Sequence, residues 1–539
     1  MKTGKQSAGY LLAGGMTLVL FAAQAVLMSA TLAHAGGLVA TLALSALYAL
    51  VFGGAMAAYV HMERPDRGTL AFAGGFAALA MLARVSMLDF VTADYVSFLS
   101  GWVEAFRTGG FAMLAQNVGD YNLLYQYILL LISQSPLHDL YLIKFVTVVF
   151  DYALALVMMR AAGRFGGEKA KLPVFLTMLV LPTTLLDGAC WGQCDSVYAF
   201  FVVSSLYLLA TDRPTRSAIM LSVAFAFKLQ TIFFFPVVLL GLLHRKFKLR
   251  HAIAFFAAYV VTMTPALAAG RSFMDALSVY ANQSMGQYYD RLTYNAPNLY
   301  LFFPMLEFAS SQEFTWMRYI AGIDGKGLSG YLDPNLFPDL QRAALYACVV
   351  LTLIVVIYWL IHWKEITMDM ALPFALFFAI FLPFVMPKIH ERYFYLADML
   401  AILYASSRRD RRFMPLLVVG ASLMSYVPYL MRQRPIDERW LAMMMLAALC
   451  IVSRDILTQM RINRVACAAG PDMPETDAGA QTTFMKEASA EAAEESAAEE
   501  TPAAENRAEE IAVEEISAEE IAADGMPADD AAQRGGDEA

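Results

Sequence analysis

Apolar runs of about 18 residues or more recur along this chain of 539 residues, and they restrict its fold more than any other feature. A run of that length is typical of a helix that crosses a bilayer, because a helix satisfies its backbone hydrogen bonds internally. Hydrophobic residues make up 59% of the sequence and charged residues only 16%, which few soluble domains match. The sequence therefore predicts an all-α, polytopic membrane protein.

We expect about 14 membrane-spanning helices, or roughly 12 if the segment 217–244 is a re-entrant pair instead of two spans. The first apolar run ends beside Leu32 to Ala35, which resembles a signal-peptide cleavage site, but its length favours an uncleaved helix. The expected spans are residues up to 30, 37–59, 69–88, 139–159, 172–186, a helix ending near 210, the pair within 217–244, 252–269, 341–363, 370–386, 393–406, 412–430 and 440–456.

Lys and Arg gather in alternate connections, which fixes the expected orientation because such residues are enriched in cytoplasmic loops. This pattern places both termini in the cytoplasm. It places two long loops, 89–138 and 270–340, and the short segment around His390 on the outer face. We therefore expect a membrane protein whose working side faces away from the cytoplasm.

The chain divides into three expected parts. Residues 1–67 hold two additional N-terminal helices, 68–466 form the main membrane module, and 467–539 form an acidic tail. From Pro471 onward there are 21 acidic and 3 basic residues, so the formal net charge of −9 hides a basic membrane body. The tail is low-complexity and lacks aromatic residues after Phe484, which predicts disorder in the cytoplasm, with a partner-binding helix as the less favoured alternative.

Residues 89–127 are rich in acids and aromatics, and a long loop of this kind is usually either functional or disordered. Asp94 lies just beyond the third expected helix, where partial desolvation raises the basicity of a carboxylate. It suits a general base that removes a proton from a hydroxyl, although a solvated acid at a helix end is an equal alternative. Tyr95, Asp120 and Tyr121 are candidate substrate-binding residues, or members of an interfacial aromatic belt and a turn.

Two more segments place polar residues beside apolar helices. Trp191, Gln193 and Asp195 lie in a short turn, where an indole, an amide and a carboxylate suit a sugar by stacking and hydrogen bonding. Asp195 alternatively belongs to the N-terminal cap of the next helix, and both roles are compatible. Lys228 lies in a stretch that is otherwise apolar, where a charge either marks function or snorkels to the surface.

His390, Glu391 and Arg392 form a charged segment between two apolar helices on the expected outer face. Histidine and arginine together suit a phosphate, the alternative being a loop that is merely basic. The sequence contains no P-loop, GxSxG or HExxH pattern, and no Cys and His spacing typical of zinc, so we predict no cofactor and no metal. Cys190 and Cys194 either form a disulfide or remain free thiols.

Five stretches, in this order, resemble the GT-C superfamily of integral membrane glycosyltransferases, and within it the bacterial mannosyltransferase-like proteins related to the second glycosylphosphatidylinositol mannosyltransferase. They are ADYVSFLSGW, GDYNLLYQY, WGQCDSVYA, FAFKLQ and KIHERYFYL, and the similarity covers about residues 84–405. The resemblance implies a GT-C fold and a catalytic aspartate at Asp94. It places the segment His390 to Arg392 near a lipid phosphate. Residues 119–125 depart from the family, whose members often have prolines after the Asp-Tyr pair.

The resemblance implies transfer of a hexose, with mannose favoured over glucose, from a polyprenyl-phosphate donor to an acceptor hydroxyl, with inversion. Asp94 would be the base, and the groups expected to bind substrate are Tyr95, Asp120, Tyr121, Trp191, Gln193, Asp195, Lys228, His390, Glu391 and Arg392. The expected partners are this donor, a glycan, lipid or protein acceptor and the bilayer, with no nucleic acid. A transporter or lipid flippase, and a non-catalytic assembly protein that works through its tail, are the alternatives from other classes.

Overall fold

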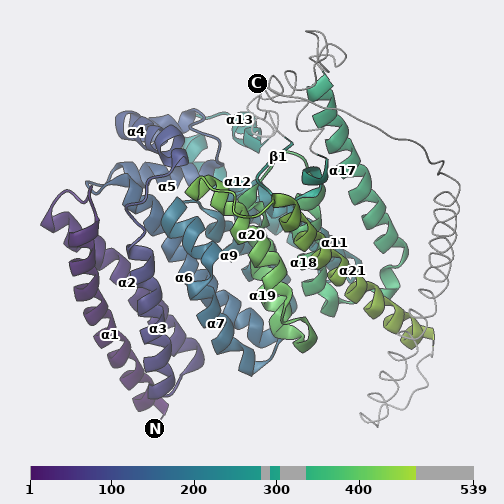
Figure 1. The fold of residues 1–539 in the computed structure, drawn as a ribbon, viewed down its shortest axis with the longest axis horizontal. Helices are drawn as coiled ribbons and strands as arrows, with labels where there is room; N and C mark the ends of the chain where they lie inside the picture. Colours follow the sequence, from purple (N-terminus) through teal and green to yellow (C-terminus); the bar gives the residue numbers. More distant parts are fainter. Residues whose placement is uncertain (1, 281–291, 304–335, 469–539) are drawn as a thin grey trace, which may run out of the picture. The chain divides into compact units, whose positions relative to one another are not determined.

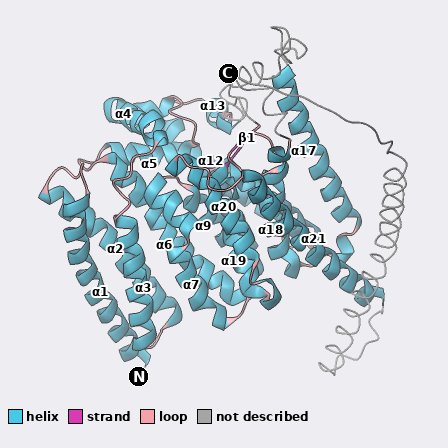
Figure 2. Ribbon diagram, viewed as in Figure 1, coloured by secondary structure: helices cyan, strands magenta, loops and turns pink. Residues whose placement is uncertain are grey.

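The structure, a computed structural model, describes residues 2–280, 292–303 and 336–468. The predicted disorder of the tail at 469–539, and much of the expected loop 270–340, fall outside these residues. Residues Met1–Ile456 form one compact unit and Leu457–Ala539 a second. Within the second, Gln459 donates a hydrogen bond to Asn463. Helices supply nearly all the regular structure (Figure 2), which confirms the all-α prediction.

Nine helices in the described part of the chain are long and apolar enough to cross a membrane, and they make this a multi-pass membrane protein. They are α1 (Lys2–Thr31), α2 (Leu38–Glu63), α3 (Arg67–Val85), α6 (Asp139–Phe165), α12 (Leu249–Ala268), α17 (Leu336–Ile361), α18 (Ala371–Val385) with the turn before it, α20 (Met414–Met431) and α21 (Glu438–Ala468). A bent pair passes the same test as a unit and is either a broken tenth span or a re-entrant loop. It consists of η3 (Glu168–Ala170) and α7 (Lys171–Val180) before the bend, and α8 (Pro182–Thr184) and η4 (Leu185–Trp191) after it.

The other expected spans are helical but short. Four helices have fewer residues than a bilayer needs, namely α9 (Asp195–Ala210), α10 (Pro214–Phe227), α11 (Phe235–Leu243) and α19 (Tyr395–Ser407). The segment 217–244 is broken at Lys228, whose backbone is extended, with φ −149° and ψ 134°. A short 3-10 helix, η5 (Leu229–Phe234), then leads into α11. The lysine thus lies between the two halves, as the sequence indicated.

The connections at one end of the helices are folded as well. The loop expected at 89–138 contains η1 (Tyr95–Leu99), α4 (Ser100–Gly109), η2 (Gly110–Ala115) and α5 (Leu123–Ser133). The connection after α12 contains α13 (Phe273–Leu277), β1 (Thr293–Tyr294) and η6 (Leu299–Phe302). Figure 1 shows α4, α5, α13 and β1 together at the end of the helices opposite the N-terminus. Short 3-10 turns, η8 (Trp363–Glu365), η9 (Met368–Met370) and η11 (Arg409–Arg411), lie in the other connections.

A two-residue parallel pairing joins segments that are far apart in sequence. β1 pairs with β2 (Ile389–His390), with Thr293 opposite Ile389 and Tyr294 opposite His390. Directly after β2, the 3-10 helix η10 (Glu391–Phe394) leads into α19. The pairing therefore fixes the charged segment of residues 390–392 against the second long connection.

A buried arginine joins helix α6 to two neighbouring helices. The buried Arg84 of α3 pairs with Asp151 of α6 at 2.9 Å and donates to the Leu179 carbonyl of α7 at 2.6 Å. Both side chains of the pair are excluded from solvent, so neither charge can be removed alone without a large loss of stability. One guanidinium thus fastens three helices, and α3 leads directly into the connection that carries Asp94.

Candidate active site

The Asp94 carboxylate is held by two neutral donors. Trp191 Nε1 lies 2.9 Å from Asp94 Oδ2, and Gln193 Nε2 lies 2.7 Å from the same oxygen. A guanidinium nitrogen of Arg392 is 3.6 Å from it. The Asp94 side chain keeps 23% of its surface exposed, so a substrate can still reach it. The geometry is that of a fixed, accessible carboxylate able to accept a proton.

Tyr429 of α20 also contacts Asp94, and the sequence analysis did not select it. Its ring stacks on Trp191 with centroids 4.2 Å apart, and its hydroxyl accepts the Asp94 backbone N–H at 2.9 Å. The two residues of that hydrogen bond are 335 positions apart. Tyr429 lies in an apolar helix end where an interfacial tyrosine is common, so no local pattern marks it.

A charge network lies beside Asp94. Lys228 Nζ is 2.5 Å from Asp195 Oδ1, and Arg392 Nε is 3.7 Å from Asp195 Oδ2. Asp195 and Lys228 are buried, with their side chains 0% and 5% exposed. Arg392 therefore lies between two carboxylates, Asp94 and Asp195, and its guanidinium also stands over the Trp191 ring at 5.4 Å. Burial of this many charges is sustained because each has an opposite partner.

The structure separates the alternatives that the sequence left open for two of these residues. Asp195 is the first residue of α9, but no side-chain hydrogen bond caps that helix, and the carboxylate binds Lys228 instead. Lys228 does not reach the surface. It stays buried and lies 5.9 Å from the Tyr121 ring and 5.7 Å from the Tyr198 ring. Both residues thus belong to one buried site.

Gln193 connects the first loop to this site. Its amide donates to Asp94 through Nε2, and its Oε1 accepts the Tyr121 hydroxyl at 2.8 Å. Burial raises the pKa of Tyr121 well above its ordinary value, so this hydroxyl stays protonated and continues to donate. The direction of the Tyr121 hydrogen bond fixes the orientation of the amide, and the amide in turn orients the carboxylate.

His390 and Glu391 also lie in the site, but their protonation differs from that of an exposed histidine and an exposed glutamate. The His390 ring stacks on Tyr294 at 4.6 Å. Burial, with Arg392 and Lys228 nearby, lowers the pKa of His390 to about 3, so its imidazole is neutral at pH 7. Burial raises the pKa of Glu391 to about 7. The positive charge of this site therefore comes from Lys228 and Arg392.

Two of the expected site residues lie elsewhere. Tyr95 follows Asp94 directly, but its hydroxyl donates to Asp139 Oδ1 at 2.6 Å, in a separate pocket. Asp120 is exposed and forms no ion pair with any residue that the structure describes. Cys190 and Cys194 are buried free thiols. No group of three or more His, Cys, Asp or Glu side chains within the described ranges could hold a metal ion.

Lys144 is a supporting residue that the sequence analysis missed. It is buried in α6, and its ammonium donates to the carbonyls of Met87, Leu88 and Phe90, at 3.1, 2.9 and 2.7 Å. These carbonyls belong to the turn between α3 and Asp94, so Lys144 fixes the approach to the carboxylate. A signal was available, because a lysine within an expected span is the same feature that singled out Lys228.

The fold and the site together define a multi-pass membrane protein that presents a carboxylate, an indole and an amide beside a buried pair of cations. The family model of glycosyltransferase family 87 matches residues 127–387 and supports a membrane glycosyltransferase. The matched part includes Trp191, Gln193, Asp195 and Lys228, whereas Asp94 and Arg392 lie outside it. No curated protein matches the sequence.

Proposed function

We propose that this protein transfers a hexose from a polyprenyl-phosphate donor to an acceptor hydroxyl, on the outer side of a bacterial inner membrane. The observation that carries the proposal is the meeting of Asp94 with Arg392 and, through Asp195, with Lys228. A base and a cationic site for a phosphate are the two groups that such a transfer needs. Mannose is favoured over glucose by the resemblance to mannosyltransferase-like proteins.

In the proposed step, Asp94 takes the proton of the acceptor hydroxyl, and that oxygen forms a bond to the anomeric carbon of the donor sugar. The bond between the anomeric carbon and the phosphate oxygen breaks, and polyprenyl phosphate leaves with the electron pair. Attack from the face opposite the leaving group inverts the anomeric configuration. Trp191 and Gln193 hold the carboxylate in place, and preorganisation of this kind accounts for much of enzymatic rate acceleration.

Lys228 and Arg392 are the groups that would bind the donor phosphate. In the ligand-free protein they are neutralised by Asp195 and Asp94, so the site holds no uncompensated buried charge before the donor arrives. A phosphate that approaches Arg392 competes with the Asp94 carboxylate for the guanidinium. Weaker pairing to Arg392 leaves Asp94 a better proton acceptor, which couples donor binding to the activation of the base.

The test is the Asp94→Asn variant, which keeps the size of the side chain and removes its charge. A general base contributes about 10² to 10⁴ in rate, so turnover should fall by at least about a hundredfold. Binding of a short-chain polyprenyl phosphate should change little, because Lys228 and Arg392 remain. The readout is transfer of radiolabelled hexose in proteoliposomes. Binding of the short-chain polyprenyl phosphate is measured separately.

Asp120→Asn is the matched control, since Asp120 is an exposed carboxylate in the same loop. It should keep turnover within about twofold of wild type, as surface substitutions usually have small effects. An active Asp94→Asn variant beside an inactive Asp120→Asn variant would contradict the assignment of the base. If neither wild type nor variant transferred hexose from any polyprenyl-phosphate donor, the donor class itself would be wrong.

A further inference from the structure

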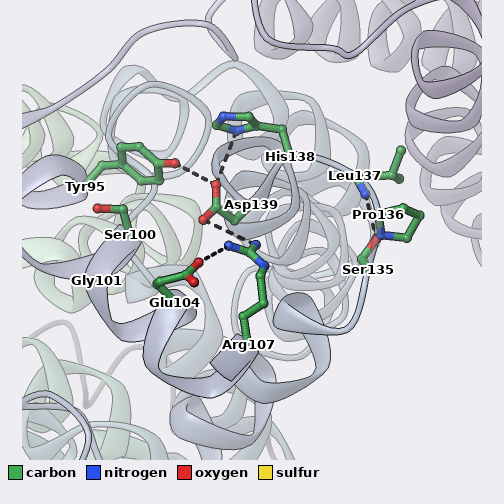
Figure 3. Close-up of a pocket in the computed structure, with 10 residues that line it drawn as sticks. All are labelled: Tyr95, Ser100, Gly101, Glu104, Arg107, Ser135, Pro136, Leu137, His138 and Asp139. Atoms are coloured by element: carbon green, nitrogen blue, oxygen red, sulfur yellow. Dashed lines mark hydrogen bonds and ion pairs between the residues drawn. The ribbon is translucent and has the colours of Figure 1, made fainter. Parts of the chain in front are cut away.

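A polar pocket of about 670 Å³ is lined by Tyr95 but not by Asp94. Its walls come from η1, α4 and the turn between α5 and α6 (Figure 3). Tyr95 is the residue after Asp94, and neighbouring Cα atoms are about 3.8 Å apart. The Asp94 side chain reaches Trp191 and Gln193, whereas that of Tyr95 reaches Asp139. Two consecutive residues at the start of η1 thus reach the candidate active site and the pocket, one side chain to each.

The polar groups of the pocket are fixed by one another. Asp139 Oδ1 accepts the Tyr95 hydroxyl at 2.6 Å and its neighbour's backbone N–H at 2.9 Å. Arg107 donates to Glu104 at 2.6 Å, and its other terminal nitrogen is 3.9 Å from Asp139 Oδ2. Figure 3 shows these side chains directed toward one another at one side of the pocket. Arg107 therefore lies between two carboxylates, hydrogen-bonded to Glu104 and within ion-pair distance of Asp139.

This set of groups complements an uncharged ligand that is rich in hydroxyls. The carboxylates of Glu104 and Asp139 accept hydrogen bonds and Arg107 donates them, while the Ser100 hydroxyl donates to the Val96 carbonyl at 3.3 Å and can accept one. His138 Nδ1 lies 3.3 Å from Asp139 Oδ1. Two carboxylates and one guanidinium do not favour a phosphate or another polyanion. The volume falls within the range of about 300 to 1,000 Å³ that is typical of small-molecule sites. A sugar residue meets these conditions of charge, hydrogen bonding and size.

We propose that this pocket is a subsite that binds a sugar residue of the acceptor, an inference that rests on the proposed function. The donor phosphate would lie by Lys228 and Arg392, and the acceptor's reacting hydroxyl would lie by Asp94. A pocket that shares the Asp94 backbone is suited to hold the remainder of an acceptor glycan. The acceptor would then be a glycan or glycolipid with at least one sugar beyond the residue that reacts.

The experiment is ligand-observed saturation-transfer NMR on the full chain in nanodiscs, with a neutral mannose disaccharide as the probe. Glu104→Ala and Arg107→Ala each remove hydrogen-bonding groups, so the saturation transfer to the probe should fall by about threefold to tenfold. Arg439→Ala is the control, since it breaks a similarly exposed arginine–carboxylate pair, with Asp437, outside the pocket. Excess polyprenyl phosphate should not displace the probe.

Saturation transfer that is absent from wild type, or equal in wild type, Glu104→Ala and Arg107→Ala, would overturn the subsite. The Asp94→Asn variant separates this failure from failure of the proposed function. Its probe binding should equal that of wild type, because Asp94 makes no contact with the pocket groups, while its turnover is lost. Normal probe binding with unchanged turnover in Asp94→Asn would contradict the role of the base and leave the pocket assignment standing.

Discussion

At the scale of single residues, the candidate site is organised by alternating charge. Asp94, Arg392, Asp195 and Lys228 form a row in which every charge has an opposite neighbour. The neutral His390 and the partly protonated Glu391 flank this row and add little net charge. Such a row remains stable as it stands, because each buried charge keeps an opposite partner.

Glu391 gives a stability prediction with a defined sign. Its pKa is about 7 in the folded protein and lies near 4.3 in an unfolded chain, because burial disfavours the charged form. Between these values the folded state keeps a proton that the unfolded state has lost. The free energy of unfolding should therefore fall as the pH rises from about 4.5 to about 7, by up to about 3 kcal/mol.

The Glu391→Gln variant removes this dependence. Its melting temperature minus that of wild type should increase between about pH 5 and about pH 8, measured by thermal unfolding in detergent. The depressed pKa of His390 acts with the opposite sign, since stability from a buried neutral histidine grows as the pH rises. Because His390 Nδ1 lies 3.8 Å from the Glu391 carboxylate, a His390→Gln background is used for both proteins. A difference that stays constant across this range would contradict the elevated pKa of Glu391.

Most of the site residues could be selected from the sequence by their type, but the directions in which their side chains point could not be predicted. Asp94, Trp191, Gln193, Lys228 and Arg392 were selected by residue type and setting, and the structure brings them together. Tyr95 was grouped with Asp94 because the two are adjacent. Its side chain enters another pocket, since successive residues of a helical turn point in different directions.

At the scale of elements, the site residues lie where helices are irregular. Asp94 precedes a π-helical turn, Trp191 ends another, and Lys228 interrupts a third helix with an extended residue. Irregular backbone within a membrane protein is tolerated where protein or a cavity surrounds it, and π-turns are frequent at functional sites. Hydrophobic periodicity cannot predict these breaks, because tertiary partners such as Lys144 satisfy the freed backbone groups.

Lys144→Met tests this support of the backbone. The substitution keeps an unbranched side chain one atom shorter and leaves the carbonyls of Met87, Leu88 and Phe90 without their common donor. We expect a loss of about 2 to 4 kcal/mol in the free energy of unfolding, because buried carbonyls without a donor are costly. Turnover should fall by about tenfold or more as the Asp94 approach shifts, while polyprenyl phosphate binding is retained.

Lys246→Met serves as the comparison, since Lys246 is a partly exposed lysine paired with the exposed Asp212. It should change stability by less than about 1 kcal/mol. Thermal unfolding and single-turnover transfer measure the two effects. Equal stability and turnover for Lys144→Met and wild type would show that the turn after α3 does not depend on this ammonium.

At the scale of the whole molecule, the sequence predicted the fold class correctly and placed helices where the structure has them. It could not predict helix lengths, since α9, α10, α11 and α19 are shorter than a bilayer requires, and apolar composition does not reveal where a helix ends inside the protein. That residues 94, 191–195, 228 and 390–392 meet in one site could not be predicted. The sequence predicted only which connections lie on the same side of the membrane.

That shared side is itself testable. Charge asymmetry predicts that α4 lies outside, so a Thr108→Cys protein should react with a membrane-impermeant maleimide in intact spheroplasts. Thr108 is exposed. Lys169→Cys, in a connection expected inside, should react only after the membrane is disrupted. Both are made in a background with Cys450→Ser and Cys467→Ser, and the reverse labelling pattern would invert the proposed sidedness.

The hydrogen bond between Asp94 and Tyr429 has a consequence for biosynthesis. Its two ends are separated by 335 residues, so Asp94 is synthesised and inserted long before its partner exists. Every shorter nascent chain lacks the ring that stacks on Trp191 and the hydroxyl that fixes Asp94. A ribosome-bound intermediate would consequently carry an incomplete site until the helix that holds Tyr429, one of the last to be made, is in place.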